Sequence, residues 1–129
     1  MQKRAQVEMQ IVHELLPWKI MFRSHPGTVI TVEYLLFRIY SQLNGIEGKI
    51  FDEDFLCEYL DEKDRRDIYE SFRRRCRRDE ALRVEGMKKV DFLNEYYIFN
   101  GLKKDGDLWV MKLKKGEVRE PQNPTLTYI

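Results

Sequence analysis

One stretch of the chain, residues 61–78, restricts the possible folds more than any other. It reads DEKDRRDIYESFRRRCRR and places Ile68, Phe72 and Cys76 at a strict spacing of four residues. An α-helix advances about 100° per residue, so these three side chains lie on one narrow stripe of a helix. The pattern predicts an amphipathic helix that buries this stripe against the rest of the protein.

The remaining positions of this predicted helix are strongly basic. It carries one lysine and seven arginines against five acidic residues, and the arginines are Arg65, Arg66, Arg73, Arg74, Arg75, Arg77 and Arg78. On a helical wheel, Arg66, Arg73 and Arg77 cluster within about 40° of one another on the solvent side. Arg74 and Arg78 flank this cluster. Arg75 lies towards the apolar stripe and is expected to be structural.

The net charge of +1 conceals a segregation of charge along the chain. Residues 44–62 contain one basic and seven acidic residues, whereas residues 63–78 contain eight basic and three acidic ones. A second basic stretch, residues 101–115, has five lysines against two aspartates. Because the binding of polyanions depends on the local field, a nearly neutral total does not exclude contact with nucleic acid.

The first half of the chain reads as a series of short elements. Residues 1–16 repeat apolar side chains at helical spacing and are expected to form an amphipathic helix. Residues 18–23 are aromatic and apolar, which is typical of a strand or of a packed connector. The widest apolar stripe belongs to residues 29–43, which predicts the most deeply buried helix, ended by Asn-Gly. A brief strand is expected at residues 46–51, and a helix with acidic residues in its first turn at residues 52–60.

A β-hairpin is expected towards the end of the chain. Residues 96–99 are aromatic and β-branched, and residues 108–114 alternate in polarity as a second strand would. Residues 100–107 between them contain both Asn-Gly and Asp-Gly, the strongest short turn signals. The predicted tip of this hairpin presents Lys103 and Lys104.

In this order of elements the chain resembles a winged-helix domain, a helix-turn-helix elaborated by a β-hairpin wing. GKIFDEDFLCEYL is similar to the first strand and second helix of that fold, DEKDRRDIYESFRRRCRR stands where its recognition helix belongs, and YYIFNGLKKDGDLWVMKLK where its wing belongs. The resemblance implies an α+β fold with a winged helix-turn-helix core, three helices plus the wing, at residues 29–115. An N-terminal helical extension with a connector would occupy residues 1–28, and a tail residues 116–129. The insert at residues 79–94 is longer than usual, and it reads as a helix extension ended by Gly86, a further short helix or a loop.

These features favour a small protein that binds double-stranded DNA, with transcriptional regulation as its role. Guanidinium groups on a helix in the major groove can bond guanine edges or phosphates, and lysines on a wing suit the backbone beside it. The residues expected to contact DNA are Arg65, Arg66, Arg73, Arg74, Arg77, Lys103 and Lys104. A homodimer is expected through the helix at residues 1–16.

Other interpretations stay open. The arginine-rich helix could dock on an acidic protein surface, which would make the chain a protein-interaction module in a transcription or replication complex. The arginines could also be a solvated face, paired with Asp67 or Glu70 at helical spacing. The small size and the charged content of 35% also suit a viral, plasmid-encoded or archaeal source.

The sequence argues against an enzyme, a metal site and a membrane protein. It contains none of the motifs HExxH, GxxxxGK[ST], GxGxxG and GxSxG. Cys57 and Cys76 form no CxxC pair, and His13 and His25 are isolated, so two buried free thiols are expected and no metal or cofactor is. No apolar run approaches the roughly 20 residues of a membrane span, and the N-terminus lacks an apolar signal core, which predicts a cytoplasmic protein.

Overall fold

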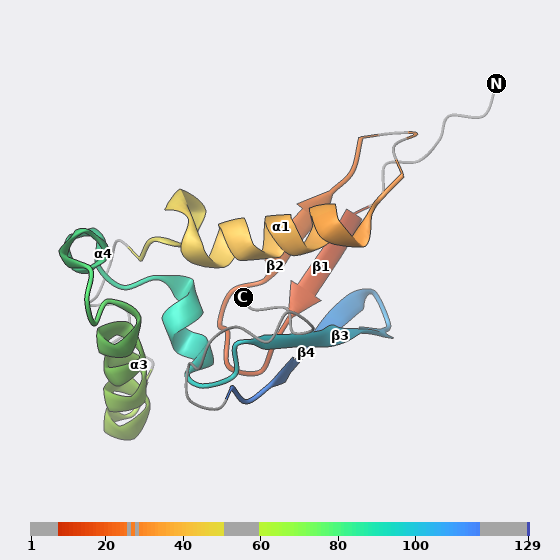
Figure 1. The fold of residues 1–129 in the computed structure, drawn as a ribbon. Coiled ribbons are helices and arrows are strands. Elements are labelled where there is room, and N and C mark those ends of the chain that lie inside the picture. Colours follow the sequence, from red (N-terminus) through yellow and green to blue (C-terminus); the bar gives the residue numbers. More distant parts are fainter. Residues whose placement is uncertain (1–7, 26, 28, 51–59, 117–128) are drawn as a thin grey trace.

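The computed structural model describes residues 8–25, 27, 29–50, 60–116 and 129. Within them the chain forms a four-stranded sheet with helices packed on it, which confirms the expected α+β class. Figure 1 shows the long helix α1 lying across the sheet, and the helix α3 at one end of the molecule, away from the strands.

The sheet joins the two ends of the described chain. Its strands are β1 (Glu8–Val12), β2 (Ile20–Arg23), β3 (Ile98–Asp105) and β4 (Leu108–Lys114), in the order β2-β1-β4-β3. β1 pairs antiparallel with β2 and parallel with β4, while β3 and β4 form an antiparallel hairpin. The parallel contact between β1 and β4 therefore places the early strands in the same sheet as the hairpin.

The prediction of an N-terminal helix at residues 1–16 is wrong for the part of it that the structure describes. Met9 and Ile11 are buried at the two-residue period of a strand, and their neighbours Glu8 and Gln10 are not. The spacing of the apolar residues fits the period of a helix as well as that of a strand. Pairing with two neighbouring strands decides in favour of β structure. Within the described residues 8–25, the chain accordingly supplies two strands of the central sheet rather than a helical extension.

Helix α1 (Val32–Asn44) begins where the Thr31 side chain accepts a hydrogen bond from the Tyr34 backbone N–H at 3.1 Å. It ends before Gly45, as the Asn-Gly pair predicts. Only Ile39 and Leu43 on its inner face are fully buried, each 1% exposed. The expected deeply buried helix therefore covers the core with one side only.

The segment after α1 differs from its prediction. Instead of a brief strand, the chain forms a single 3-10 turn, η1 (Ile46–Gly48), followed by one isolated bridge between Lys49 and Lys88. The helix predicted at residues 52–60 lies almost wholly outside the described residues, which resume at Leu60.

Helix α3 (Glu62–Arg75) confirms a helix in the arginine-rich stretch at residues 61–78, but it ends earlier than predicted, so Arg77 and Arg78 lie in the turn after it. Its N-cap is Asp61, whose carboxylate accepts from the Asp64 N–H at 2.7 Å. Ile68 and Cys76 of the predicted apolar stripe are buried, with 4% and 2% of their surface exposed. Cys76 is a free thiol, as expected, whereas Cys57 lies outside the described residues.

The insert that follows α3 forms two short elements. Helix α4 (Glu80–Glu85) is ended by Gly86, whose φ of +85° favours glycine. The 3-10 helix η2 (Lys89–Leu93) then buries Val90, Phe92 and Leu93. It packs against α1 on one side and α3 on the other, so it is the link that attaches α3 to the core.

The hairpin turns later than expected, which corrects the placement of Lys103 and Lys104. Strand β3 runs through the Asn-Gly pair with a bulge between Phe99 and Leu102, and the turn is made by the second glycine, Gly106. Lys103 pairs with Val110 and Lys104 with Trp109, so both lysines lie within the strand. The tip of the hairpin is acidic rather than basic, because it consists of Asp105, Gly106 and Asp107.

Candidate nucleic-acid interface

Arg75 and Asp91 fix the position of α3. The Arg75 Nε and Nη2 donate to the two carboxylate oxygens of Asp91 at 2.7 and 2.9 Å, and Nη2 also donates to the Gly86 carbonyl at 3.1 Å. Asp91 is only 1% exposed and accepts a third hydrogen bond, from the Lys88 N–H at 2.8 Å. Burial disfavours the charged guanidinium, but the hydrogen bond and attraction from Asp91 outweigh it and raise the pKa of Arg75. The expectation that Arg75 is structural is confirmed.

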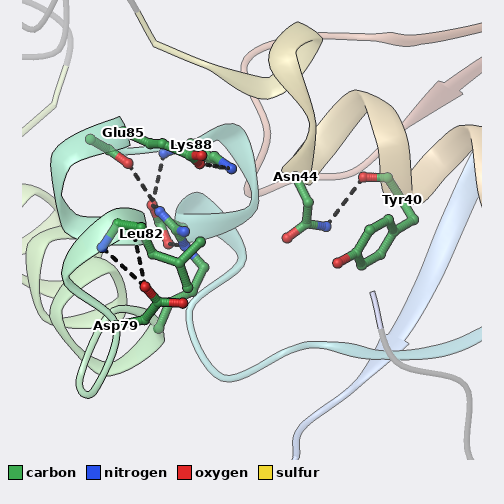
Figure 2. Close-up of polar contacts among 10 residues, drawn as sticks. Tyr40, Asn44, Asp79, Leu82, Glu85 and Lys88 are labelled. Atoms are coloured by element: carbon green, nitrogen blue, oxygen red, sulfur yellow. Dashed lines mark hydrogen bonds and ion pairs between the residues drawn. The ribbon is translucent and has the colours of Figure 1, made fainter.

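Short polar contacts also shape the chain beside α3. Figure 2 shows Asp79 at the start of α4, where its carboxylate accepts from the Leu82 N–H at 3.3 Å. In the same view, Lys88 reaches Glu85 at the end of α4, with 2.7 Å between Nζ and Oε2. The hydrogen bond and charge of Lys88 lower the pKa of Glu85. These contacts hold the turn that carries Gly86 towards Arg75.

Arg74 is a second arginine with a partner inside the protein. Its Nη1 lies 3.2 Å from Glu95 Oε1, and the other oxygen of Glu95 lies 3.0 Å from Lys115 Nζ. Hydrogen bonds from Lys115 and then from Arg74 lower the pKa of Glu95. Arg74 was expected to contact DNA, but the structure uses it to tie α3 to the two ends of the hairpin.

The arginines that remain form one exposed face. We call Arg66, Arg73 and Arg77 the arginine face; all three are exposed, as are Arg65 and Arg78 on its two sides. None of these five side chains makes an ion pair within 4 Å among the residues that the structure describes. Their guanidinium groups are therefore available to an external anion.

A shallow open depression of about 440 Å³ lies along α3. It is lined by Glu62, Arg65, Arg66, Tyr69, Glu70 and Arg73. Tyr69 is 53% exposed and tilts against Phe72 with 6.2 Å between ring centroids. Guanidinium groups around an exposed aromatic ring suit phosphate and base contacts, although the two glutamates also suit a partner of mixed charge.

The charges of α3 are ordered along its axis. Glu62 and Asp64 stand in the first turn, and three arginines stand in the last. Acidic residues at the N-terminus and basic residues at the C-terminus interact favourably with the helix macrodipole, so this order stabilises the helix whether or not a ligand is present. The same order makes the C-terminal end of α3, at Arg73, and the turn after it, which carries Arg77, the most favourable place for a phosphate.

The lysines of the hairpin do not join this face. The β3–β4 turn lies at the opposite end of the molecule from α3 in Figure 1. Lys104 instead places its ammonium 5.8 Å from the centre of the Trp109 ring, in a cation–π contact with its cross-strand partner. The structure thus brings the predicted Arg65, Arg66 and Arg73 together along the depression and places Arg77 in the turn after α3. Lys103 and Lys104 are separated from them.

Two features of the site escaped the sequence prediction. The partners Asp91 and Glu95 are 16 and 21 residues away from the arginines they bind, so no helical spacing indicates them. On the helical wheel Tyr69 falls at the edge of the apolar stripe, and in the structure it lines the depression.

The described residues show neither a metal site nor a membrane span. No group of three or more histidine, cysteine, aspartate or glutamate side chains within them could hold a metal ion. Among the same residues, no helix combines the length and the apolar content that crossing a bilayer requires.

Comparison with known proteins identifies the family of the chain. Neither the curated proteins nor the solved structures give a match. A family model matches residues 2–108, a range that spans most of the sequence and includes β1, β2 and every described helix. The chain therefore belongs to DUF6699, a family of unknown function.

Proposed function

We propose that the protein binds double-stranded DNA through the arginine face of α3, with regulation of transcription as its role. The observation that carries the proposal is that Arg66 and Arg73 on α3, and Arg77 in the turn after it, are exposed without ion-pair partners among the described residues. Arg74 and Arg75, by contrast, are used inside the protein. A solvated face needs no such concentration of arginine, since lysine serves solubility equally well.

The dimensions of α3 suit a DNA groove. Arg66 and Arg73 are seven residues apart on α3, which corresponds to about 10 Å along a helix. The major groove is about 12 Å wide and admits one α-helix. α3 is attached to the core through η2 on one side, so its outer side can approach a duplex without moving the rest of the fold.

The proposal keeps part of the winged-helix resemblance. The helices α1 and α3 and the β3–β4 hairpin follow one another in the expected order. In our proposal α3 takes the part of the recognition helix, and the hairpin makes no DNA contact because its turn lies far from α3 (Figure 1). Contacts are expected from Arg65, Arg66, Arg73 and Arg77.

The smaller number of phosphate contacts changes the expected salt dependence of DNA binding. Four phosphate contacts weaken binding roughly a hundredfold between about 50 and 200 mM salt, whereas six contacts, including both lysines, would weaken it roughly a thousandfold. A titration of fluorescence anisotropy against salt, with a labelled random-sequence duplex, therefore tests which residues take part.

The decisive variant is Arg73→Glu with Arg77→Glu. We expect it to abolish duplex binding and to leave the circular dichroism unchanged, because neither side chain makes an ion pair among the described residues. The matched control, Lys103→Glu with Lys104→Glu, reverses two charges at the other end of the molecule and should bind as the wild type does. Undiminished binding by the arginine variant would refute the proposal.

A second candidate is an acidic protein partner for the same face. It is favoured by Glu62 and Glu70, which interrupt the arginines along the depression and would repel a phosphate backbone. If the partner is an acidic protein, the wild-type protein does not contact duplex phosphates through α3. Its duplex binding then shows no log-linear dependence on salt.

A further inference from the structure

We propose that the outer face of α1 joins two copies of this chain in a symmetric dimer. Tyr34, Phe37 and Tyr40 are 49%, 61% and 51% exposed, although large aromatic side chains are usually buried. They are spaced three residues apart, and Phe37 in the middle lies on the side of α1 away from the buried Ile39 and Leu43. The ring of Tyr34 also packs edge-on against Phe22 of β2, with 5.7 Å between the ring centroids. This inference does not depend on DNA binding.

Two further apolar side chains are exposed just outside the two ends of the helix. Val29, just before α1, is 84% exposed, and Ile46, just after it, is 86% exposed. With the three aromatic residues, these side chains offer an apolar area on the order of 600 Å², larger than the scattered apolar contacts of an ordinary surface. A standard interface covers about 800 Å² on each partner, so the face and a polar rim are sufficient for a stable dimer.

The arrangement of this face suits a second copy of the same helix. It is nearly symmetric about Phe37, with one tyrosine three residues before it and one three residues after it. In an antiparallel pair of α1 helices, Phe37 lies at the two-fold axis and Tyr34 meets the second copy's Tyr40. The same pairing brings Val29 near the second copy's Ile46. Each apolar group then covers an apolar group, as an isologous interface requires.

The few polar groups on this face are compatible with the same pairing. Ser41 and Asn44 are the uncharged polar residues on the outer side, and Asn44 already donates to the Tyr40 carbonyl at 3.2 Å (Figure 2). Glu33 is the acidic residue beside the stripe. Antiparallel pairing places it next to the second copy's Ser41 and about 12 Å along the axis from the second copy's Glu33, so like charges do not meet. A strongly charged partner would find no complementary group here.

The proposed dimer contact lies in a different element from the one that the sequence suggested. The sequence suggested a homodimer through a helix at residues 1–16, and the described part of that segment is instead a strand inside the sheet. The exposed apolar helix is α1.

The oligomeric state tests the inference directly. Sedimentation velocity at concentrations up to about 100 μM should show a dimer for the wild type. Phe37→Glu should weaken the dimer at least thirtyfold, the change expected for an aromatic residue at the centre of an interface. The control Val84→Glu alters a 79% exposed side chain on α4 and should remain dimeric. A monomeric wild type, or a Phe37→Glu variant that dimerises as the wild type does, would overturn the proposal.

A mixing experiment tests the register and does not depend on Phe37. The variants Glu33→Lys and Ser41→Glu are prepared separately, each with a different tag. In the proposed pairing, the introduced lysine of one copy faces the introduced glutamate of the other, so the mixture should form heterodimers in preference to either homodimer. Random assortment of the two variants would contradict the antiparallel register.

Discussion

The pair Arg75–Asp91 gives the strongest test of how α3 is attached. The Arg75 side chain is 13% exposed and Asp91 1%, and two hydrogen bonds of 2.7 and 2.9 Å join them. Removing one partner of such a pair leaves an uncompensated buried charge, which costs about 3–5 kcal/mol. Asp91→Ala also removes the acceptor of the Lys88 N–H, so its cost lies at the upper end of that range.

This cost is large against the stability of a small domain. Folded domains are stable by about 5–15 kcal/mol, so Asp91→Ala should remove a third or more of the free energy of unfolding. Urea titrations followed by tryptophan fluorescence can measure it, because Trp18 packs edge-on against Phe92, next to Asp91, with 4.7 Å between ring centroids. Arg75→Met should cost a similar amount.

The double variant Arg75→Met with Asp91→Leu tests whether the loss of stability comes from an unpaired buried charge or from lost packing. Replacing both charges by apolar side chains leaves no unpaired charge, so the double variant should be more stable than either single variant. The control Arg74→Met removes an arginine whose ion pair with Glu95 is half exposed and should have a much smaller effect. Additive costs in the double variant would refute the reasoning, as would single variants no less stable than the control.

Two further predictions concern a helix terminus and an ion pair. Thr31→Ala removes the side-chain acceptor of the Tyr34 N–H and should lower the free energy of unfolding by about 1 kcal/mol in the same urea titration, whereas Thr31→Ser should not. Glu95→Gln should make the thermal stability less dependent on pH. The pKa of Glu95 in the folded protein is held below its ordinary 4.5, so its contribution is complete above that value and is lost as the pH falls through the lower, folded value. The melting temperatures of the variant and the wild type should therefore converge in acid; a difference that persists there would contradict this assignment.

The helix α3 could be predicted because its signals are local. The spacing of Ile68, Phe72 and Cys76 and the direction of Arg75 both follow from helical geometry within one segment. The same holds for the end of α1 at Asn-Gly and for the existence of the hairpin. Each of these depends on residues a few positions apart.

The errors arose where distant parts of the chain decide the structure. Residues 8–12 form a strand because β2 and β4 lie beside them, and their apolar spacing alone also fits a helix. Two glycine turn signals compete in the hairpin, and the pairing of β3 with β4 across Gly101 decides between them. The partners of Arg74 and Arg75 and the exposure of one side of α1 likewise depend on tertiary contacts. The positive charge of the candidate site could therefore be predicted from the sequence, whereas the set of residues that form the site could not.

The parallel pairing of β1 with β4 has a consequence for synthesis of the protein. Gln10 pairs with Leu108, so β1 is made long before the strand β4 that pairs with it. Until β4 leaves the ribosome, one edge of β1 has no partner, and an unpaired strand edge is a site of aggregation. Contacts between such distant residues also slow folding, because a long loop must close before they form. We expect a nascent chain that stops before β4 to depend on chaperones, and the native sheet to appear only after β4 has been made.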